Sequence, residues 1–332
     1  MTKQPTVLVT GGAGYVGSHV CKALHRSGFT PVTLDNLSTG HRQAVQWGPL
    51  EIGDVRDADF VAEAMTRHKT AAVLHFAALS LVGESAAKPY EYYDNNVGGA
   101  ISLVAAMRRC GVSRIVFSST CAIYGMPDRL PIEETEFTRP INVYGRTKLA
   151  VENFLADTAA TGAIRTVMLR YFNAAGADGD GNIGEAHATE THLVPLAIQA
   201  ALDPRRPLNV FGSDYPTADG TCERDYVHVE DLAEAHIQAL AFLETTGGSR
   251  AYNLGTGNPV SVRQVIRAVE RVLGTTVPVV EAPRRAGDPP RLFAAPGLAE
   301  GDLGWVATRS DIESIVESAV RWHRSNVFSV AV

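Results

Sequence analysis

The stretch TVLVTGGAGYVG, residues 6–17, decides the fold of this chain. Its first half is a short apolar run that indicates a β-strand, and the spacing G-x-G-x-x-G follows at once, from Gly12 to Gly17. Glycines in such a turn let backbone N–H groups approach a pyrophosphate, and the N-terminus of the next helix favours the phosphate charge. We therefore expect a dinucleotide-binding loop formed by Gly11, Gly14, Tyr15, Val16 and Gly17.

Downstream of this loop, strand-like runs alternate with helical patterns. The strand candidates are residues 6–10, 30–34, 71–76, 114–118 and 166–171, and the crossover helices are expected at 14–26 and 95–110. This alternation predicts a parallel sheet that is covered on both faces. The expected fold class is α/β, a doubly wound parallel sheet of the Rossmann type with a smaller C-terminal substrate-binding lobe.

The alternation breaks in the second half of the chain. A Gly/Asp-rich loop at 176–184 and a helix near 193–202 indicate a second lobe, whereas a helix at 231–243 and a strand at 251–254 return to the first pattern. A helix capped by Ser261 and ended by Gly274 follows. We predict a cofactor domain of residues 1–173 with return segments near 227–260, and a substrate lobe of residues 174–226 and 261–332. The apolar tail, 325–332, either frays or docks at an interface.

The second predicted strand ends at Asp35, where a carboxylate accepts hydrogen bonds from both ribose hydroxyls of a dinucleotide. A carboxylate repels a 2′-phosphate, and the residues that follow, from Asn36 to Thr39, include no arginine to receive one. NAD is therefore favoured over NADP. Asp54 follows another short strand, and it lies either near the adenine amine or in a plain turn.

Composition excludes several classes of protein. The 332 residues are 45% hydrophobic and 20% charged, which is typical of globular chains and not of fibrous or disordered ones. A net charge of −6 gives no reason to expect nucleic acid or an anionic membrane as a partner. We expect neither a signal peptide nor a membrane span. The four cysteines form no C-x-x-C pair, so we expect reduced, mostly buried thiols and a cytoplasmic protein.

Tyr144 and Lys148 are four residues apart and share one face of a predicted helix. Elsewhere this spacing is often a half-buried aromatic beside a solvated charge. Here the pair follows a strand and the hydroxyl run Ser118 to Thr120. A nearby cation favours a phenolate, so Lys148 and a positive nicotinamide ring together are expected to bring the pKa of Tyr144 near neutrality and make it a general base.

Together these features resemble the extended branch of the short-chain dehydrogenase/reductase superfamily, and within it the UDP-glucose 4-epimerase family. The most family-specific strings are Asp214-Tyr215-Pro216-Thr217 and Arg224-Asp225-Tyr226-Val227-His228-Val229. Further matching stretches cover nearly the whole chain: residues 11–17, 35–37, 53–55, 75–78, 82–85, 92–97, 118–120, 171–173, 253–257 and 284–288.

The resemblance implies roles for individual residues. Tyr144 would be the base, Lys148 its activator and a ligand of the nicotinamide ribose, and Thr120 the hydroxyl that bridges to the sugar oxygen. Beside the glycine loop and the Tyr144/Lys148 pair, the implied NAD site comprises Asp35, Asn36, Leu37, Ser38, Thr39, Gly40, Asp54, Val55, Phe76, Ala77, Ala78, Ser80, Asn95, Ser118 and Phe172. With Thr120 and Tyr144, the implied UDP-sugar site comprises Asn173, His192, Leu193, Asn209, Phe211, Arg224, Tyr226, Arg285, Asp288 and Leu292.

Some of these residues carry alternatives. The arginines suit a diphosphate, which takes charge-assisted donors, but they could instead pair with Asp225 or Asp288. Ser80 stands where some family members have a lysine, and His192 where some have an asparagine. We expect no metal, because no carboxylate or cysteine partner at ligand spacing joins His187 and His192.

The function that the resemblance implies is interconversion of UDP-glucose and UDP-galactose through transient C4 oxidation with bound NAD, a 4-keto sugar and return of the hydride. The alternatives are 4-epimerisation of a UDP-N-acetylhexosamine, UDP-glucuronate or UDP-pentose, or a non-catalytic NAD-sensing protein on the same fold. A 4,6-dehydratase is disfavoured, because Cys121-Ala122 stands where that family has an Asp-Glu pair. A homodimer is expected from the resemblance.

Overall fold

The computed structural model describes residues 4–285 and 287–325. Its strands are β1 (Thr6–Thr10), β2 (Thr30–Asp35), β3 (Leu50–Ile52), β4 (Thr70–His75), β5 (Arg114–Thr120), β6 (Arg165–Tyr171), β7 (Asn173–Ala175), β8 (Leu208–Phe211), β9 (Glu223–Arg224), β10 (Tyr226–His228), β11 (Ser249–Leu254), β12 (Val260–Ser261), β13 (Val279–Ala282) and β14 (Arg291–Leu292). Its α-helices are α1 (Tyr15–Arg26), α2 (Ala58–His68), α3 (Val82–Ser85), α4 (Pro89–Tyr92), α5 (Gly99–Arg109), α6 (Val143–Ala160), α7 (Leu193–Leu202), α8 (Val229–Thr245), α9 (Val262–Leu273), α10 (Gly297–Leu303) and α11 (Ile312–Ser325). Short 3-10 turns occur at η1 (Arg42–Ala44) and η3 (Cys121–Ile123), and η2 (Tyr93–Gly98) is a π-helix.

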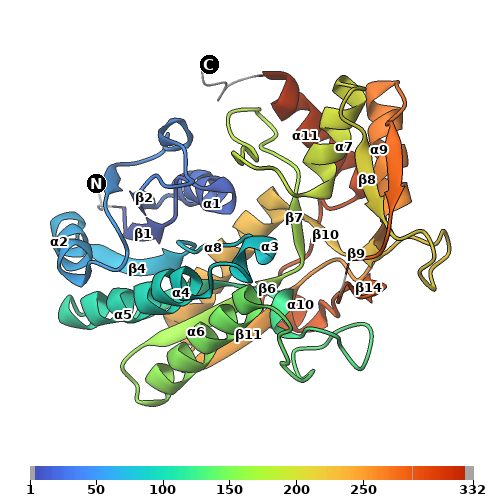
Figure 1. The fold of residues 1–332 in the computed structure, drawn as a ribbon. Coiled ribbons are helices and arrows are strands. Elements are labelled where there is room, and N and C mark those ends of the chain that lie inside the picture. Colours follow the sequence, from blue (N-terminus) through green and yellow to red (C-terminus); the bar gives the residue numbers. More distant parts are fainter. Residues whose placement is uncertain (1–3, 286, 326–332) are drawn as a thin grey trace.

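A seven-stranded parallel sheet with the order β11-β6-β5-β4-β1-β2-β3 is the centre of the structure (Figure 1). This order confirms the predicted doubly wound α/β class. The chain moves outward from β1 through β2 to β3, and then continues on the other side of β1 from β4. Ligands of such sheets bind at the carboxyl ends of the strands where the order reverses, which here is the crevice between β1 and β4.

Successive side chains of β1 pack against opposite faces of the sheet. Leu8 packs into a core with α2, α5 and α6, while Val7 and Val9 pack into a second core with α1 and α8. All three side chains are at most 1% exposed. This period of two, buried on both sides, explains why the strand is apolar throughout.

The expected crossover helix at 95–110 is regular only from Gly99, because the backbone from Tyr93 to Gly98 widens into a π-helix. The Asn96 side chain accepts a hydrogen bond from Leu79 N at 2.8 Å and donates to Leu79 O at 3.0 Å and to Thr147 Oγ1 at 3.1 Å. These bonds hold the buried Asn96 amide inside the fold. Such π-bulges are frequent at functional sites, and neighbouring Asn95 lines the cleft described below.

The second lobe lies beyond the carboxyl ends of β5 and β6. Its core contains side chains of α7, α9 and α11 together with β8, and small sheets pair β7 with β10, β8 with β13, and β9 with β12 and β14. The chain enters the lobe through β7, returns through β10 and α8 to strand β11 of the large sheet, and leaves again into α9. Ser261 forms a capping box at the start of α9, and Gly274 ends that helix in the left-handed conformation, as predicted.

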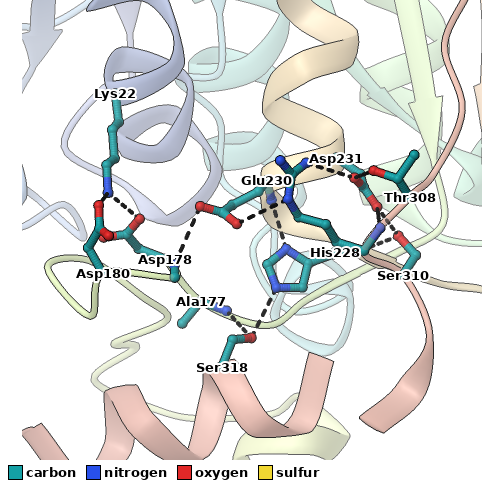
Figure 2. A network of polar contacts seen from close by, with 12 residues as sticks. Lys22, Ala177, Asp178, Asp180, His228, Glu230, Asp231, Thr308, Ser310 and Ser318 are labelled. Atoms are coloured by element: carbon teal, nitrogen blue, oxygen red, sulfur yellow. Dashed lines mark hydrogen bonds and ion pairs between the residues drawn. The ribbon is translucent and has the colours of Figure 1, made fainter. Parts of the chain in front are cut away.

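A polar network fastens the 177–185 segment to helices of both lobes (Figure 2). The Lys22 ammonium on α1 pairs with Asp178 and, at 2.7 Å, with Asp180. Ala177 N donates to Ser318 Oγ of α11 at 3.0 Å, and Gly179 N donates to Glu230 Oε1 of α8 at 3.4 Å. The segment is therefore held from three helices before it reaches the cleft.

Within residues 4–285 and 287–325, no helix combines the length and apolar character needed to cross a bilayer. All four cysteines are free thiols, but only Cys21 and Cys222 are buried; Cys110 and Cys121 are partly exposed. The expectation for the C-terminal tail falls on 326–332, outside the described residues.

Candidate active site

A cleft of about 1630 Å³ opens at the carboxyl edge of the large sheet and extends against the second lobe. Its floor includes Gly11 after β1, Asp35 at the end of β2, Phe76 after β4 and Thr120 at the end of β5. Pockets for one drug-sized ligand measure about 300–1,000 Å³. The cleft therefore has room for two nucleotide-sized molecules side by side.

The glycine loop forms a cradle that side chains would fill. Gly11 has a φ of +72°, and a Cβ there would lie 2.6 Å from Ala77 N. A Cβ on Gly17 would lie 2.3 Å from Gly11 O. The loop thus packs strand, helix and the 76–77 turn as closely as a pyrophosphate site at a helix N-terminus requires. These residues fit a dinucleotide cofactor.

Asp35 is 8% exposed at the edge of this cradle. Burial raises the pKa of its carboxyl group, and hydrogen bonds from Leu37 N at 2.8 Å and Ala13 N at 3.0 Å act in the opposite direction. The carboxylate is oriented by the backbone, with lone pairs left to accept ribose hydroxyls. None of the residues from Asn36 to Gly40 is basic, so no cation there could receive a 2′-phosphate.

The sequence-predicted residues converge on this one cleft. All of them line it except Leu37 and Asp54. Leu37 adopts a positive φ of 58° and supplies its backbone N–H to Asp35. The Asp54 carboxylate pairs with Arg56 at 2.7 Å and accepts a hydrogen bond from Asn36 Nδ2 at 3.2 Å. Both alternatives for Asp54 stay predictions, because a carboxylate paired with Arg56 keeps lone pairs that can accept a further hydrogen bond.

Tyr144, Lys148 and Thr120 meet at the centre of the cleft. Asn142 caps helix α6 by accepting a hydrogen bond from Gly145 N at 2.7 Å, so Tyr144 and Lys148 lie in the first turns of that helix. The Lys148 ammonium donates to Ser118 O at 2.8 Å and lies 5.8 Å from the centre of the Tyr144 ring. The Thr120 hydroxyl accepts a hydrogen bond from Ala122 N at 3.1 Å.

The expected pKa of Tyr144 is not reproduced by the chain alone. Burial raises the pKa of the Tyr144 phenol well above its usual value, and a hydrogen bond with Thr120 only partly opposes this rise. Burial also lowers the pKa of Lys148 to about 7. Desolvation disfavours both charged forms, so the lowered pKa expected of Tyr144 stays a prediction for the protein with the positive nicotinamide ring of NAD bound beside Lys148.

Two arginines enter the cleft from the second lobe. Arg224 pairs with Asp288, and both side chains are largely buried, with 12% and 23% exposure. The Arg285 guanidinium lies 4.1 Å from the centre of the Phe211 ring. Asp225 does not pair with Arg224; it accepts hydrogen bonds from Thr256 N at 2.8 Å and Gly257 N at 3.0 Å. The alternative of ion pairing thus holds for Asp288 only, and that pair itself lines the cleft.

The expectation that His187 and His192 have no carboxylate partner is wrong. Glu185 and Glu190 lie within ion-pair distance of both imidazoles. The two glutamates beside the imidazole raise the pKa of His187 to about 9. Burial acts to lower the pKa of His192, but the same two glutamates outweigh it and raise that pKa to about 10. The four residues are close together in sequence, in the spacing E-x-H-x-x-E-x-H, which was a signal that could have found them.

Other cleft residues were not predicted from the sequence. Ile141, Gln199 and Arg206 line the cleft, as does His187. The Tyr171 hydroxyl also lines it and lies 2.5 Å from Ser118 Oγ. Gln199 lies on α7 and Tyr171 ends β6, and which of these side chains faces the cleft depends on tertiary packing.

Three comparisons with known proteins agree with this geometry. The sequence model of the NAD dependent epimerase/dehydratase family matches residues 7–255. The chain is 52% identical to a UDP-glucose 4-epimerase of Rhizobium leguminosarum bv. trifolii, with 96% of this chain and 97% of the relative covered.

Two crystal structures resemble the fold closely. One is a UDP-glucose 4-epimerase of Brucella ovis in complex with NAD, with a TM-score of 0.93, 51% identity, and coverage of 95% of this chain and 97% of that one. The other is a UDP-glucose-4-epimerase of Stenotrophomonas maltophila with bound NAD and formylated UDP-arabinopyranose, with a TM-score of 0.95, 43% identity, and coverage of 98% and 100%.

Proposed function

The chain belongs to the NAD dependent epimerase/dehydratase family, and we propose that it interconverts UDP-glucose and UDP-galactose as an NAD-dependent 4-epimerase. The relatives that match nearly its whole length are named as UDP-glucose 4-epimerases. The observation that carries the proposal is the convergence of three features on one cleft: the glycine cradle, the Tyr144/Lys148/Thr120 cluster, and the arginines of the second lobe.

NAD, held by the glycine cradle and Asp35, would supply a reversible acceptor for the hydride at C4 of the sugar. Tyr144 would act as a phenolate, take the proton of the O4 hydroxyl on its oxygen, and return that proton when the hydride returns to the other face of the 4-keto sugar. Thr120 would hold the O4 hydroxyl against Tyr144. No net oxidation results, so the same cofactor serves each turnover.

Lys148 has two tasks in this scheme. Its ammonium is anchored to Ser118 O and faces the cradle, so it would donate to the nicotinamide ribose. Its charge would also stabilise a Tyr144 phenolate. Because burial brings the pKa of Lys148 to about 7, its charge is sensitive to pH in the range where the enzyme is expected to work.

Arg224 and Arg285 would bind the diphosphate of the UDP-sugar. A guanidinium offers several N–H donors in a fixed plane and suits phosphate oxygens. The pairing of Arg224 with Asp288 orients one of them before the ligand arrives. Phe211, whose ring contacts the Arg285 guanidinium, also lines the cleft and would contribute an aromatic surface to the nucleotide-sugar site.

We further propose the division of labour expected from the sequence: residues 1–173 with the return segments near 227–260 bind the cofactor, and residues 174–226 and 261–332 bind the nucleotide sugar. A homodimer and a cytoplasmic location remain proposals of the same kind. The absence of disulfides among the four cysteines is consistent with a reducing compartment.

A broader substrate range is the second candidate function. Leu292 of β14 is half-buried and lines the cleft. In the resembled family this position, four residues after Asp288, lies near the hexose ring, and a bulky tyrosine there goes with rejection of N-acetylated sugars. Leucine is smaller, so an acetamido group at C2 would have room.

The test is the turnover of the purified protein on a panel of UDP-hexoses, UDP-N-acetylhexosamines, UDP-pentoses and UDP-glucuronate. Turnover of UDP-galactose to UDP-glucose without added reductant supports the proposal. Binding of NAD without turnover of any UDP-sugar would support the non-catalytic alternative instead.

A further inference from the structure

Two glutamates and two histidines meet at the rim of the cleft, on the segment that connects β7 to α7. Glu185 is the deepest of them, with a side chain that is 4% exposed, and Glu190 is 8% exposed. One carboxylate oxygen or ring nitrogen from each residue can be chosen so that all four atoms lie within 4.8 Å of one another. They thus surround a common point from one short segment.

Three of the separations between imidazole nitrogens and carboxylate oxygens in this cluster are close to those of ligands around one metal ion. His187 Nδ1 lies 3.2 Å from Glu185 Oε1 and 3.6 Å from Glu190 Oε2, and His192 Nδ1 lies 3.5 Å from Glu190 Oε1. Zinc bonds to imidazole nitrogen and carboxylate oxygen are about 2.0–2.2 Å long, so tetrahedral ligand atoms are separated by roughly 3.4 Å. The pair of His192 and Glu185 is closer than this and would have to open to admit an ion.

One nitrogen in the cluster lacks a hydrogen bond. His187 Nδ1 is buried, and no acceptor or donor among the described residues reaches it with good hydrogen-bond geometry. Its short distance to Glu185 therefore reflects proximity rather than a well-directed hydrogen bond. A buried ring nitrogen in this state is costly unless it is given a partner, and a metal ion at the centre of the cluster would be that partner.

From this geometry we propose that Glu185, His187, Glu190 and His192 bind one divalent transition-metal ion of the Zn²⁺ class. Two imidazoles and two carboxylates favour Zn²⁺ over Mg²⁺ and Ca²⁺, which prefer oxygen ligands and higher coordination numbers. The ligands come from residues 185–192 alone, so the ion closes this segment into a ring.

The ring would have a structural effect on the cleft. The segment touches the cofactor side through His41, whose Nε2 lies 2.6 Å from Ala186 O, and it touches α11 through Trp322, whose Nε1 donates to Glu185 O at 2.8 Å. His187, Glu190 and His192 line the cleft. Metal binding would therefore hold this part of the cleft lining in one conformation.

The test uses the full chain without an affinity tag, dialysed against a chelator and then against metal-free buffer. Zn²⁺ is titrated by calorimetry at about pH 7 and about pH 8.5, because protons compete with the metal for both imidazoles. Binding of one ion per chain is expected, together with a rise in melting temperature. Replacement of Zn²⁺ by Co²⁺ should give the visible absorption of a tetrahedral site.

Two ligand variants locate the ion, and a third variant serves as a control. His187→Gln and Glu185→Gln each remove one ligand and should weaken binding by at least about 10-fold. His68→Gln breaks a separate His–Glu pair, in which His68 lies 2.6 Å from Glu51, and should leave binding unchanged. Circular dichroism of each variant checks that it is folded.

Each outcome decides the proposal. One ion per chain that both ligand variants lose and the control keeps supports it. Failure of the wild type to bind Zn²⁺ at either pH overturns it and leaves the cluster as an ion-paired network. Binding that persists in both folded ligand variants also overturns it, because the ion then lies elsewhere. These readouts do not depend on turnover, so they are independent of the proposed epimerase activity.

Discussion

Replacement of Glu152 by glutamine should destabilise the protein although the residue touches no ligand. Glu152 lies on α6, one turn after Lys148, and is 3% exposed. Its carboxylate accepts hydrogen bonds from Arg170 Nη2 at 2.6 Å, Arg170 Nε at 3.0 Å and Ser119 Oγ at 2.5 Å. Glu152→Gln keeps the shape but removes the charge that faces a buried guanidinium.

The expected loss follows from that burial. Removal of one partner of a buried ion pair costs about 3–5 kcal/mol, because the other charge stays desolvated. Arg170 also donates to Tyr124 Oη at 2.9 Å and Glu134 O at 3.3 Å, and the glutamine oxygen still accepts a hydrogen bond. We therefore expect the free energy of unfolding to fall by about 3 kcal/mol, the lower end of that range. With an unfolding entropy of about 2.1 cal/mol/K per residue, 332 residues correspond to roughly 0.7 kcal/mol/K, so the melting temperature should fall by about 4 °C.

The assay is thermal and urea unfolding of the wild type, Glu152→Gln, Arg170→Met and the double variant. The double variant should lose less than the sum of the single variants, because it leaves no unpaired charge. Asp128→Asn is the matched control: Asp128 and Arg139 form a 2.6 Å pair with both side chains 57% exposed, and such pairs are worth about 0–1 kcal/mol. If Glu152→Gln is no more destabilising than Asp128→Asn, burial is not what makes the pair important and the reasoning is refuted.

The remaining predictions concern the cleft. Tyr144→Phe should lower kcat on UDP-galactose by about 10²–10⁴-fold while NAD still binds, and near wild-type turnover would exclude Tyr144 as the base. Lys148 has a pKa of about 7 in the folded protein against its usual 10.5, so the unfolded chain binds more protons between these values and stability rises with pH there. Lys148→Met should therefore raise the melting temperature of cofactor-free protein most at about pH 7 and least near pH 10. A difference in melting temperature between variant and wild type that does not change with pH would contradict this. Asp35→Ala should weaken NAD binding and reduce the ratio of NAD affinity to NADP affinity, both measured on cofactor-stripped protein. An unchanged affinity ratio would show that another residue sets the choice of cofactor. Leu292→Tyr should lower turnover of UDP-N-acetylgalactosamine selectively, by a steric penalty of about 1–3 kcal/mol, and equal losses on UDP-galactose would show that Leu292 does not select the sugar.

The features that the sequence alone determined are local. The strand at 6–10, the glycine loop and the carboxylate of Asp35 depend on residues close together in the chain, since turn geometry and strand periodicity act over a few positions. The same holds for α9, whose first and last residues follow from Ser261 and Gly274. The Tyr144/Lys148 pair was also found in this way, because residues four apart share one face of a helix.

What only the tertiary structure decided is where charge is buried and which distant groups meet. Arg224 and Asp288 are 64 residues apart in sequence, and no periodicity predicts that they pair. The pKa of Tyr144 rises chiefly because the surrounding residues desolvate its phenol, an effect that the spacing of Tyr144 and Lys148 in the sequence does not show. The spacing of Glu185, His187, Glu190 and His192 was present in the sequence, but their convergence required α1 and α11 to hold the segment in one conformation. The burial of a charged group and the meeting of side chains distant in sequence both depend on non-local packing, so a local sequence pattern specifies neither.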